Sequence, residues 1–377
     1  MIHELIINAA REIQSQVIID WKNQGKKVVG YTCSYLPKEL LYAAQILPVR
    51  LRGIGTDGMA IADAYYGPFI CSFPKCMLQL AGEGKLSFLD GVIITDGCDS
   101  MRRLDECWRK ASDDYSGIKP DFFHYFGVPH KKALHGIQWL MEEILELKKR
   151  LEDHFSIQIT HDDLMQSIRT YNKGRQLIKQ IADIRAQKQS VITGTDAFMI
   201  TLAGTVMPCD IYHDHLAMFI DQLSQHTSEH EHKHRIMIVG SADDDITLIQ
   251  LIENAGAIVA AEKVCFSMDL ELTPVNEDTD PIRSLAERYL CNATCPRMFG
   301  QYESRLNHLK HTIEKNHIQG VILQNIRFCD LHGSENGLFE KDLEAIGIPC
   351  MRIEREYGSQ MDIGRLQMRI DAFLERL

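Results

Sequence analysis

The sequence predicts an α/β protein with two parallel-sheet domains, and three observations support this prediction. Short apolar runs alternate with helical segments over residues 1–136, and the same alternation returns over residues 234–377. Between them, residues 137–233 are long, charged and helically periodic. Strands that alternate with helices form a mainly parallel sheet covered on both faces. We therefore expect two Rossmann- or flavodoxin-like domains joined by a helical linker domain.

The N-terminal section contains its expected elements in order. The run KKVVGYTC (26–33) predicts a strand, and PKELLYAAQIL (37–47) predicts a helix that begins at a proline. PVRLRGIG, DGVIITDGC and DFFHYFGVPH predict three further strands, because β-branched and aromatic residues are bounded there by Gly, Asp or Pro. Residues 63–88 supply a loop and a helix between the second and third strands.

The middle and C-terminal sections are less regular. Residues 137–155 and 162–188 predict long charged helices. The polar tract SQHTSEHEHKH that follows is expected to be a solvated linker rather than a metal site; its histidines are His226, His230, His232 and His234. RIMIVGSADDD then predicts a strand and turn, but its single Gly240 lacks the glycine spacing of a dinucleotide-binding turn.

Composition narrows the class of protein. The chain has 377 residues, 45% of them hydrophobic, and a net charge of −11. This charge disfavours nucleic acid or an anionic membrane as the main partner, since both require a basic surface. The N-terminal segment reads as an amphipathic surface helix rather than a signal peptide, and no run of about 18 apolar residues predicts a membrane span. We expect a cytoplasmic protein.

Cysteine is the unusual residue, with eleven in the chain. In a reducing compartment these are packing residues, metal ligands or catalytic thiols rather than a disulfide framework. The chain context favours a packing role for four of them: Cys107, Cys209, Cys291 and Cys350.

Four other cysteines directly follow predicted strands: Cys33, Cys98, Cys265 and Cys329. Ligands of open α/β sheets bind beyond the carboxyl ends of the strands, so these thiols, with Cys71 and Cys76, are expected to converge on a cleft between the domains. A nearby helix N-terminus is expected to lower the thiol pKa and favour the metal-binding thiolate. Converging thiolates without matching histidines favour an iron–sulfur centre. Zinc remains the alternative, although among these six thiols only Cys71 and Cys76 lie close together in the sequence.

Several segments resemble one family in the order of its signatures. GYTCSYLPKELLYAAQILPVRLRG, FICSFPKCMLQLAGEGKLSFLDGVIITDGCDSMRRLDECW, AERYLCNATCPRM and GVILQNIRFCD are similar to the 2-hydroxyacyl-CoA dehydratase and benzoyl-CoA reductase subunits, in particular the smaller subunit. The resemblance implies a [4Fe–4S] cluster held by Cys71, Cys98 and Cys329, with Cys76 as a substitute for Cys71. It implies a related second subunit, an ATP-hydrolysing iron–sulfur activator that supplies single electrons, and an acyl-CoA substrate that is dehydrated or reduced.

The resemblance leaves alternatives open. Some relatives hold a double-cubane [8Fe–9S] cluster and act as homodimeric reductases of small molecules. The additional Cys33, Cys76 and Cys265 would bring the thiols to the six that such a cluster needs, although packing at the strand ends is the slightly favoured interpretation of Cys33 and Cys265. A non-catalytic electron-relay subunit is a further alternative. Arg102 and Arg103 could contact CoA phosphates or the activator, but exposed helix residues are more commonly only solvated.

Overall fold

The computed structural model describes residues 2–223, 234–291, 295–358 and 363–377. Its strands form two separate four-stranded sheets in which every pairing is parallel. The predicted fold class is therefore confirmed. The histidines His226, His230 and His232 lie outside the described residues, whereas His234 is the first residue of a strand rather than part of a linker.

The two sheets have the same topology. The first has the order β2-β1-β3-β4 and the second has the order β6-β5-β7-β8. Both match the first four strands of the flavodoxin-like order 2-1-3-4-5. The strands are β1 (Lys27–Tyr31), β2 (Ile46–Arg50), β3 (Gly91–Thr95), β4 (Phe122–Phe126), β5 (His234–Gly240), β6 (Ala257–Lys263), β7 (Gly320–Ile326) and β8 (Cys350–Arg355).

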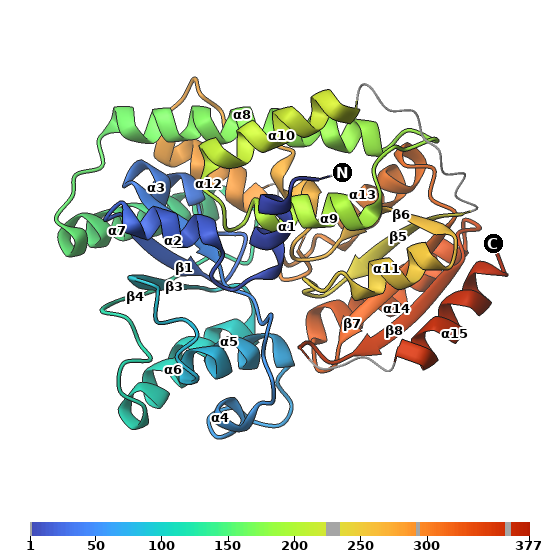
Figure 1. The fold of residues 1–377 in the computed structure, drawn as a ribbon, viewed down its shortest axis with the longest axis horizontal. Coiled ribbons are helices and arrows are strands. Elements are labelled where there is room, and N and C mark those ends of the chain that lie inside the picture. The colour runs from blue at the N-terminus through green and yellow to red at the C-terminus, as the bar shows by residue number, and fades with distance from the viewer. Residues whose placement is uncertain (1, 224–233, 292–294, 359–362) are drawn as a thin grey trace.

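Helices cover both sheets, as Figure 1 shows. The N-terminal section holds α1 (Glu4–Arg11), α2 (Gln16–Asn23), α3 (Lys38–Ala43), α4 (Ala60–Asp63), α5 (Ser72–Gly82) and α6 (Asp99–Asp114). The middle section holds α7 (Leu134–Phe155), α8 (His161–Arg185), α9 (Gly194–Ala203) and α10 (Cys209–Leu223). The last section holds α11 (Thr247–Asn254), the short 3₁₀ helix η1 (Met268–Glu271), α12 (Pro281–Cys291), α13 (Tyr302–Lys315), α14 (Asp330–Glu344) and α15 (Ile363–Leu374).

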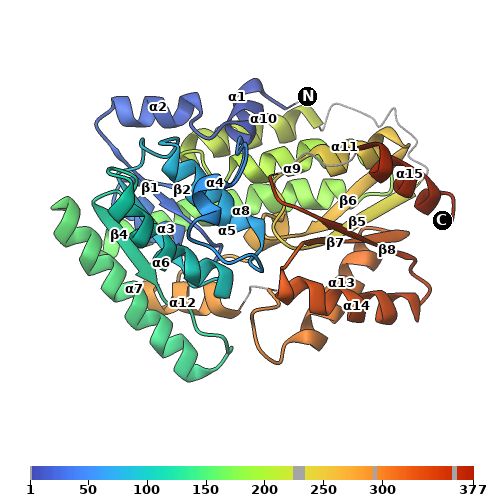
Figure 2. The same ribbon diagram turned by 90° about the horizontal axis from the view of Figure 1, so that it is seen from below.

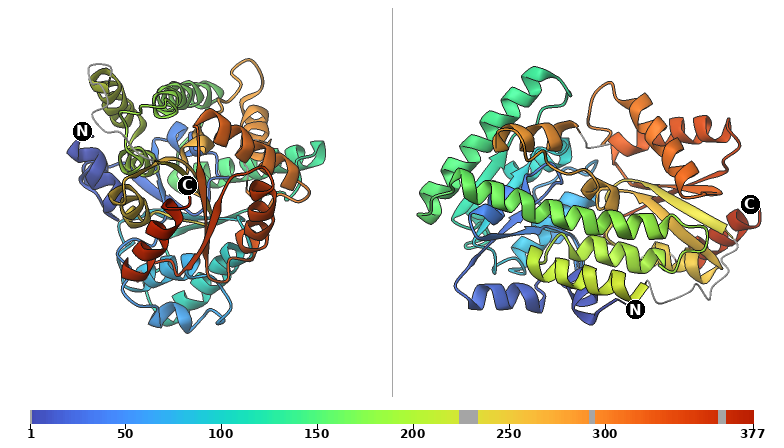
Figure 3. Two further views of the ribbon diagram at one scale, coloured as in Figure 1. Left: turned by 90° about the vertical axis from the view of Figure 1, so that its right-hand side faces the viewer. Right: turned by 90° about the horizontal axis from the view of Figure 1, so that it is seen from above.

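The first sheet is largely buried on both faces because its strands consist mostly of apolar residues. All of β3 is buried, and its alternate side chains enter different cores: Val92 and Ile94 pack in the core that contains residues of α5 and α6, while Ile93 packs with residues of α7 and α8. Figure 2 shows α5 and α6 in front of this sheet, and the right panel of Figure 3 shows the green α8 and α10 side by side on another side of the molecule.

Some helices pack against a section of the fold that is distant from them in the sequence. Helix α12 follows the second sheet's β6 in sequence, yet it packs on α7 and joins the core beneath the first sheet (Figure 2). In turn, α9 from the middle section packs on α1 and β6. The segment between β6 and α12 therefore contacts the carboxyl edge of the first sheet, where Ser34 donates to the Cys265 carbonyl and Lys38 pairs with Glu271. Among the described residues, no helix combines the length and apolar character that a membrane crossing requires.

Candidate functional site

Three cysteines occupy the same local position, one residue before a helix begins. Cys71, Cys98 and Cys329 are the N-cap residues of α5, α6 and α14. Cys329 follows Phe328, a non-glycine residue with φ of +65°, a conformation that costs free energy and turns the chain sharply after β7. The three residues therefore sit at the carboxyl edges of the sheets, as their positions in the sequence predicted.

The thiols of these three residues lie close enough to influence one another. Burial raises the pKa of Cys98 well above its usual range, and the thiols of Cys71, Cys329 and Cys33 raise it further. Burial likewise raises the pKa of Cys329 to about 12, with additional contributions from Cys71 and Cys295. The structure thus brings together Cys98 and Cys329, which come from different sheets and are far apart in sequence.

The expectation of a lowered thiol pKa is wrong for the protein without a bound group. Backbone N–H groups in the first turns of the helices do lower the pKa of Cys71, Cys98 and Cys329. Burial outweighs them, because removing a thiolate from water costs more than a few oriented amides return. These thiols stay protonated at neutral pH unless a cation replaces their protons.

A second group of thiols surrounds a cavity of about 80 Å³. Cys33 follows β1, Cys265 follows β6, and Cys295 precedes α13; all three line this cavity. Burial raises the pKa of Cys265 well above its usual range, and Cys295 and Cys33 add to the rise. The absence of a side chain at Gly97 leaves room for the Cys33 thiol, since a Cβ at Gly97 would lie 3.0 Å from the Cys33 Sγ atom.

The pKa contributions indicate that the two groups of thiols are neighbours, because ionising a thiol of one group would disfavour ionisation in the other. Cys33 acts on Cys98, and both Cys295 and Cys265 interact with Cys329. We call these residues the six-cysteine site: Cys33, Cys71, Cys98, Cys265, Cys295 and Cys329.

Cys295 is the member that sequence reasoning missed as a candidate. Its signal was the spacing in LCNATCP, where Cys291 and Cys295 are four residues apart. Of the two, Cys291 is exposed at the end of α12, whereas Cys295 lies inside the cavity wall. Only the folded chain distinguishes them.

Cys76 is not brought to the cavity. It is fully buried within α5, where its Sγ lies 3.7 Å from the carbonyl oxygen of Tyr357. It also packs tightly against Gly53 and Gly358. Among the other thiols, only Cys71 contributes to its raised pKa. Its position is that of a packing residue.

Cys107, Cys350, Cys209 and the two arginines lie outside the six-cysteine site. The Cys107 Sγ lies 3.5 Å from the carbonyl of Tyr65, and the Cys350 Sγ lies 3.6 Å from that of Ile348. Arg102 and Arg103 are exposed on α6, and Arg103 pairs with Glu106. Cys209 begins α10 and lines a different cavity.

The spacing of the six thiols differs from that of a mononuclear site. Within the part of the chain that the structure describes, no group of three His, Cys, Asp or Glu residues is close enough to hold a single metal ion. A zinc ion at about 2.3 Å from each sulfur would require sulfurs roughly 3.8 Å apart. The donors are instead all thiols and come from six segments, and three of them, Cys33, Cys265 and Cys295, line the cavity.

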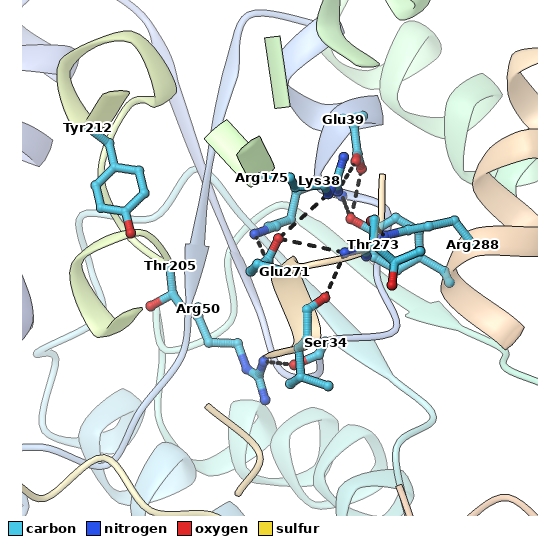
Figure 4. Close-up of polar contacts among 12 residues, drawn as sticks. Ser34, Lys38, Glu39, Arg50, Arg175, Thr205, Tyr212, Glu271, Thr273 and Arg288 are labelled. Carbon is cyan, nitrogen blue, oxygen red and sulfur yellow. Dashed lines mark hydrogen bonds and ion pairs between the residues drawn. The ribbon is translucent and has the colours of Figure 1, made fainter. Parts of the chain in front are cut away.

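A network of buried charges adjoins the cavity, and sequence reasoning did not find it (Figure 4). Arg175 on α8 lies 2.5 Å from the carboxylate of Glu39, and Lys38 lies 2.8 Å from that of Glu271. Burial opposes ionisation of Glu271, but Lys38, Arg288 and Arg175 lower its pKa to about 2. The network ties α3 in the first half to the segment after β6 in the second half.

Fold and site together define a class: a two-sheet α/β protein whose two halves share a thiol-rich site at the carboxyl edges of their strands. The chain matches the family described as "2-hydroxyglutaryl-CoA dehydratase, D-component" over residues 33–377, and it belongs to that family. The matched region contains every residue of the six-cysteine site.

Three characterised relatives show the range within this family. One subunit of benzoyl-CoA reductase, from Thauera aromatica, is 26% identical over 82% of this chain and 81% of its own length. The beta subunit of (R)-2-hydroxyglutaryl-CoA dehydratase from Acidaminococcus fermentans is 23% identical, over 96% and 95%. The beta subunit of (R)-phenyllactyl-CoA dehydratase from Clostridium sporogenes is 22% identical, over 94% and 92%. The chain is therefore similar to enzyme subunits of both a reductase and dehydratases.

Proposed function

We propose that the chain is the iron–sulfur subunit of an enzyme that transfers low-potential single electrons to an acyl-CoA, in either dehydration or reduction. Its partners would be a related second subunit or a second copy of itself, and a separate ATP-hydrolysing iron–sulfur activator. The similarity to dehydratase and benzoyl-CoA reductase subunits supports the reaction class.

The observation that carries this proposal is the convergence of six thiols from both halves of the fold. The donor set fits an iron–sulfur group, because soft thiolates bind such clusters and because the buried thiols need a cationic core to lose their protons. Cys71, Cys98 and Cys329 would hold a [4Fe–4S] cluster through three thiolates. Such a cluster supplies electron transfer and one iron without a protein ligand, open to an exogenous oxygen or sulfur ligand.

The chain's own residues would set the surroundings of that group. The cavity lined by Cys33, Cys265 and Cys295 is also walled by Leu309, Phe339 and Pro296, which would exclude water from these three thiols. Lys263 lies on the same wall, with its Nζ atom 2.7 Å from the Nε2 atom of His308, so this pair can hold a proton beside the site. Burial lowers the pKa of His332, which also lines the cavity, to about 4, so its imidazole is neutral at pH 7.

A second candidate has its own supporting observation. Cys33, Cys265 and Cys295 form a second set of three thiols around the cavity, next to the first set. Two sets of three are what a double-cubane [8Fe–9S] cluster needs if each cubane takes three thiolates. The chain would then work as a homodimeric reductase of small molecules, and Cys295 would replace Cys76 in the sequence-based set.

Iron and sulfide counting tests both candidates. The chain, expressed and purified without oxygen, should contain iron and sulfide; about four irons per chain would indicate one cubane and about eight a double cubane. In the second case Cys295→Ser should lower the iron content, whereas in the first it should not. The exposed Cys291→Ser is the matched control and should leave iron unchanged. A chain that stays free of iron under cluster-loading conditions would refute the proposal.

The protein purified without oxygen also allows a test of whether the chain binds substrate or only relays electrons. If the chain binds an acyl-CoA, amide hydrogen exchange near the six-cysteine site should slow when the acyl-CoA is added. An exchange pattern that does not change would support the electron-relay role.

A further inference from the structure

A second cavity lies directly behind the six-cysteine site. It has a volume of about 60 Å³ and lies among α8, α10, β1, β2 and the segment after β6. The two cavities share five wall residues, which are Ser34, Arg50, Cys265, Ser267 and Leu270. Any molecule in the second cavity therefore lies next to Cys265 and is separated from Cys33 and Cys295 only by this wall.

Most charges around the second cavity are matched. Lys38 pairs with Glu271, and Arg175 pairs with Glu39, which lies just outside the cavity wall. Figure 4 shows these side chains directed toward one another. These two cations and two carboxylates balance, because their partners hold both carboxylates in the ionised form.

Arg50 is the unmatched charge. It is only 4% exposed, and no carboxylate among the described residues lies within 4 Å of its guanidinium group. Its Nη1 atom donates to the Ser34 Oγ at 2.5 Å, while Nε has no hydrogen-bond partner in the described part of the chain. A buried cation without a counter-ion is expensive, so this arrangement is that of a site prepared for an anion.

The guanidinium group is also held in place before any ligand arrives. Its central carbon lies 4.6 Å from the ring centre of Phe266 and 5.7 Å from that of Tyr31. Ser34, which accepts the hydrogen bond, donates in turn to the Cys265 carbonyl at 3.3 Å. Aromatic contacts and this hydrogen bond fix the orientation of the donor groups, which lowers the entropy cost of binding a planar oxyanion.

We propose that this cavity binds a small free monoanionic carboxylate of one carbon at Arg50, next to the six-cysteine site. The size follows from the volume: a cavity of about 150 Å³ holds the six heavy atoms of benzene, so about 60 Å³ holds a group of two or three heavy atoms. The proposal extends the proposed function by naming a small anion that the electron-transferring site would meet, although binding itself requires only the cavity and Arg50.

The test uses formate as the probe and formamide as its neutral counterpart of equal heavy-atom count. The oxygen-free, cluster-loaded protein is titrated with each in a calorimeter at constant ionic strength, and iron is measured in the same sample. Formate should bind at one site per chain, and formamide should bind at least about tenfold more weakly. This comparison needs no variant, so it stands even where a substitution prevents folding.

Two variants locate the site. Arg50→Gln should weaken formate binding by at least about tenfold. Arg52→Gln is the matched control: Arg52 is equally buried but donates to the Ala10 carbonyl and lines neither of these cavities, so formate binding should remain.

The outcomes separate this proposal from the proposed function. No saturable formate binding, equal binding of formamide, or formate binding that Arg50→Gln leaves intact would each overturn the anion site. If iron is present and Arg50→Gln alters only the reduction potential, Arg50 serves solely as a counter-charge to the cysteine site, which also overturns it. Formate binding in a protein that takes up no iron would support the anion site while refuting the iron–sulfur function.

Discussion

The two sheets share one strand order but contribute to the six-cysteine site in different ways. The ends of β3 and β7 are equivalent, and each carries a cysteine that begins a helix, Cys98 and Cys329. The ends of β1 and β5 are also equivalent, but Cys33 follows β1 while Asp243 follows β5 in a buried pair with Arg355 at 2.6 Å. The strands β2 and β6 are equivalent as well, but β2 ends at Arg50, whereas β6 is followed by Cys265.

This difference shows which positions the fold itself brings together. A crossover in the strand order places the loops after β1 and β3, and after β5 and β7, at the switch points where open α/β sheets bind ligands. Cys98 of the first sheet and Cys329 of the second therefore lie at equivalent positions that face the shared site. The remaining thiols come from loops that differ between the halves, so the complete site depends on how the halves pack together rather than on either sheet alone.

The largest expected effect is the loss of iron when Cys98 or Cys329, the cysteines after the equivalent strands β3 and β7, is replaced. Cys98→Ser and Cys329→Ser should each remove most of the iron from the purified chain, and to a similar extent, because each removes a thiolate from the same group. Cys76→Ser should retain it, since that thiol packs against Tyr357. Iron analysis of proteins made without oxygen measures this. Loss of iron from Cys76→Ser but not from Cys98→Ser would reverse the assignment.

The next effect concerns the contact between the halves. Glu39→Gln should lower the free energy of unfolding by about 3 kcal/mol, because it leaves the buried Arg175 cation with only the more distant Glu271 carboxylate, 3.9 Å away. Arg103→Ala on the exposed surface of α6 is the control and should cost at most about 1 kcal/mol. Denaturant titration of both variants against the unchanged chain gives the comparison. Equal losses would show that the buried network does not hold the halves together.

The smallest effect is a pH dependence to which buried histidines and a buried carboxyl group contribute with opposite signs. Burial lowers the pKa of His124 on β4 to about 4, as it does for His213 on α10, so both should lose stability as pH falls from about 7 toward 4. Burial raises the pKa of Asp243 to about 6, so this group becomes stabilising over the lower part of the same range. For His124, His213 and Asp243 together the sum is a net loss of about 2 kcal/mol between pH 7 and pH 5, and the buried His332 adds a further loss of the same sign.

Single substitutions separate these contributions. Unfolding free energies at several pH values should show a flatter dependence for His124→Gln and a steeper one for Asp243→Asn, whatever the overall stability of each variant. A steeper dependence for His124→Gln would mean that its imidazole is charged in the folded protein.

Local sequence patterns predicted the strands because buried parallel strands are nearly continuous apolar runs. The run before Cys98 is an example, and the strand was found at Gly91–Thr95. The strand-end position of Cys329 was predictable for the same reason. The boundaries were less certain: β2 begins at Ile46, two residues before the predicted strand, because its pairing with β1 extends over the preceding apolar residues.

Other parts of the site depend on long-range packing. Nothing local distinguishes Cys295 from Cys291, since which thiol reaches the cavity depends on how α12 packs against α7. The pairing of Glu39 with Arg175 joins residues 136 positions apart. The thiol pKa was misjudged because a helix N-terminus is visible in a sequence, whereas the depth of burial that outweighs it is not.

The most direct measurement is diffraction at the iron absorption edge from crystals grown without oxygen. Anomalous density should touch the Sγ atoms of both Cys98 and Cys329, joining the two halves through one inorganic core. Iron bound only by thiols of a single half, or strong iron density away from both sulfurs, would contradict the shared site.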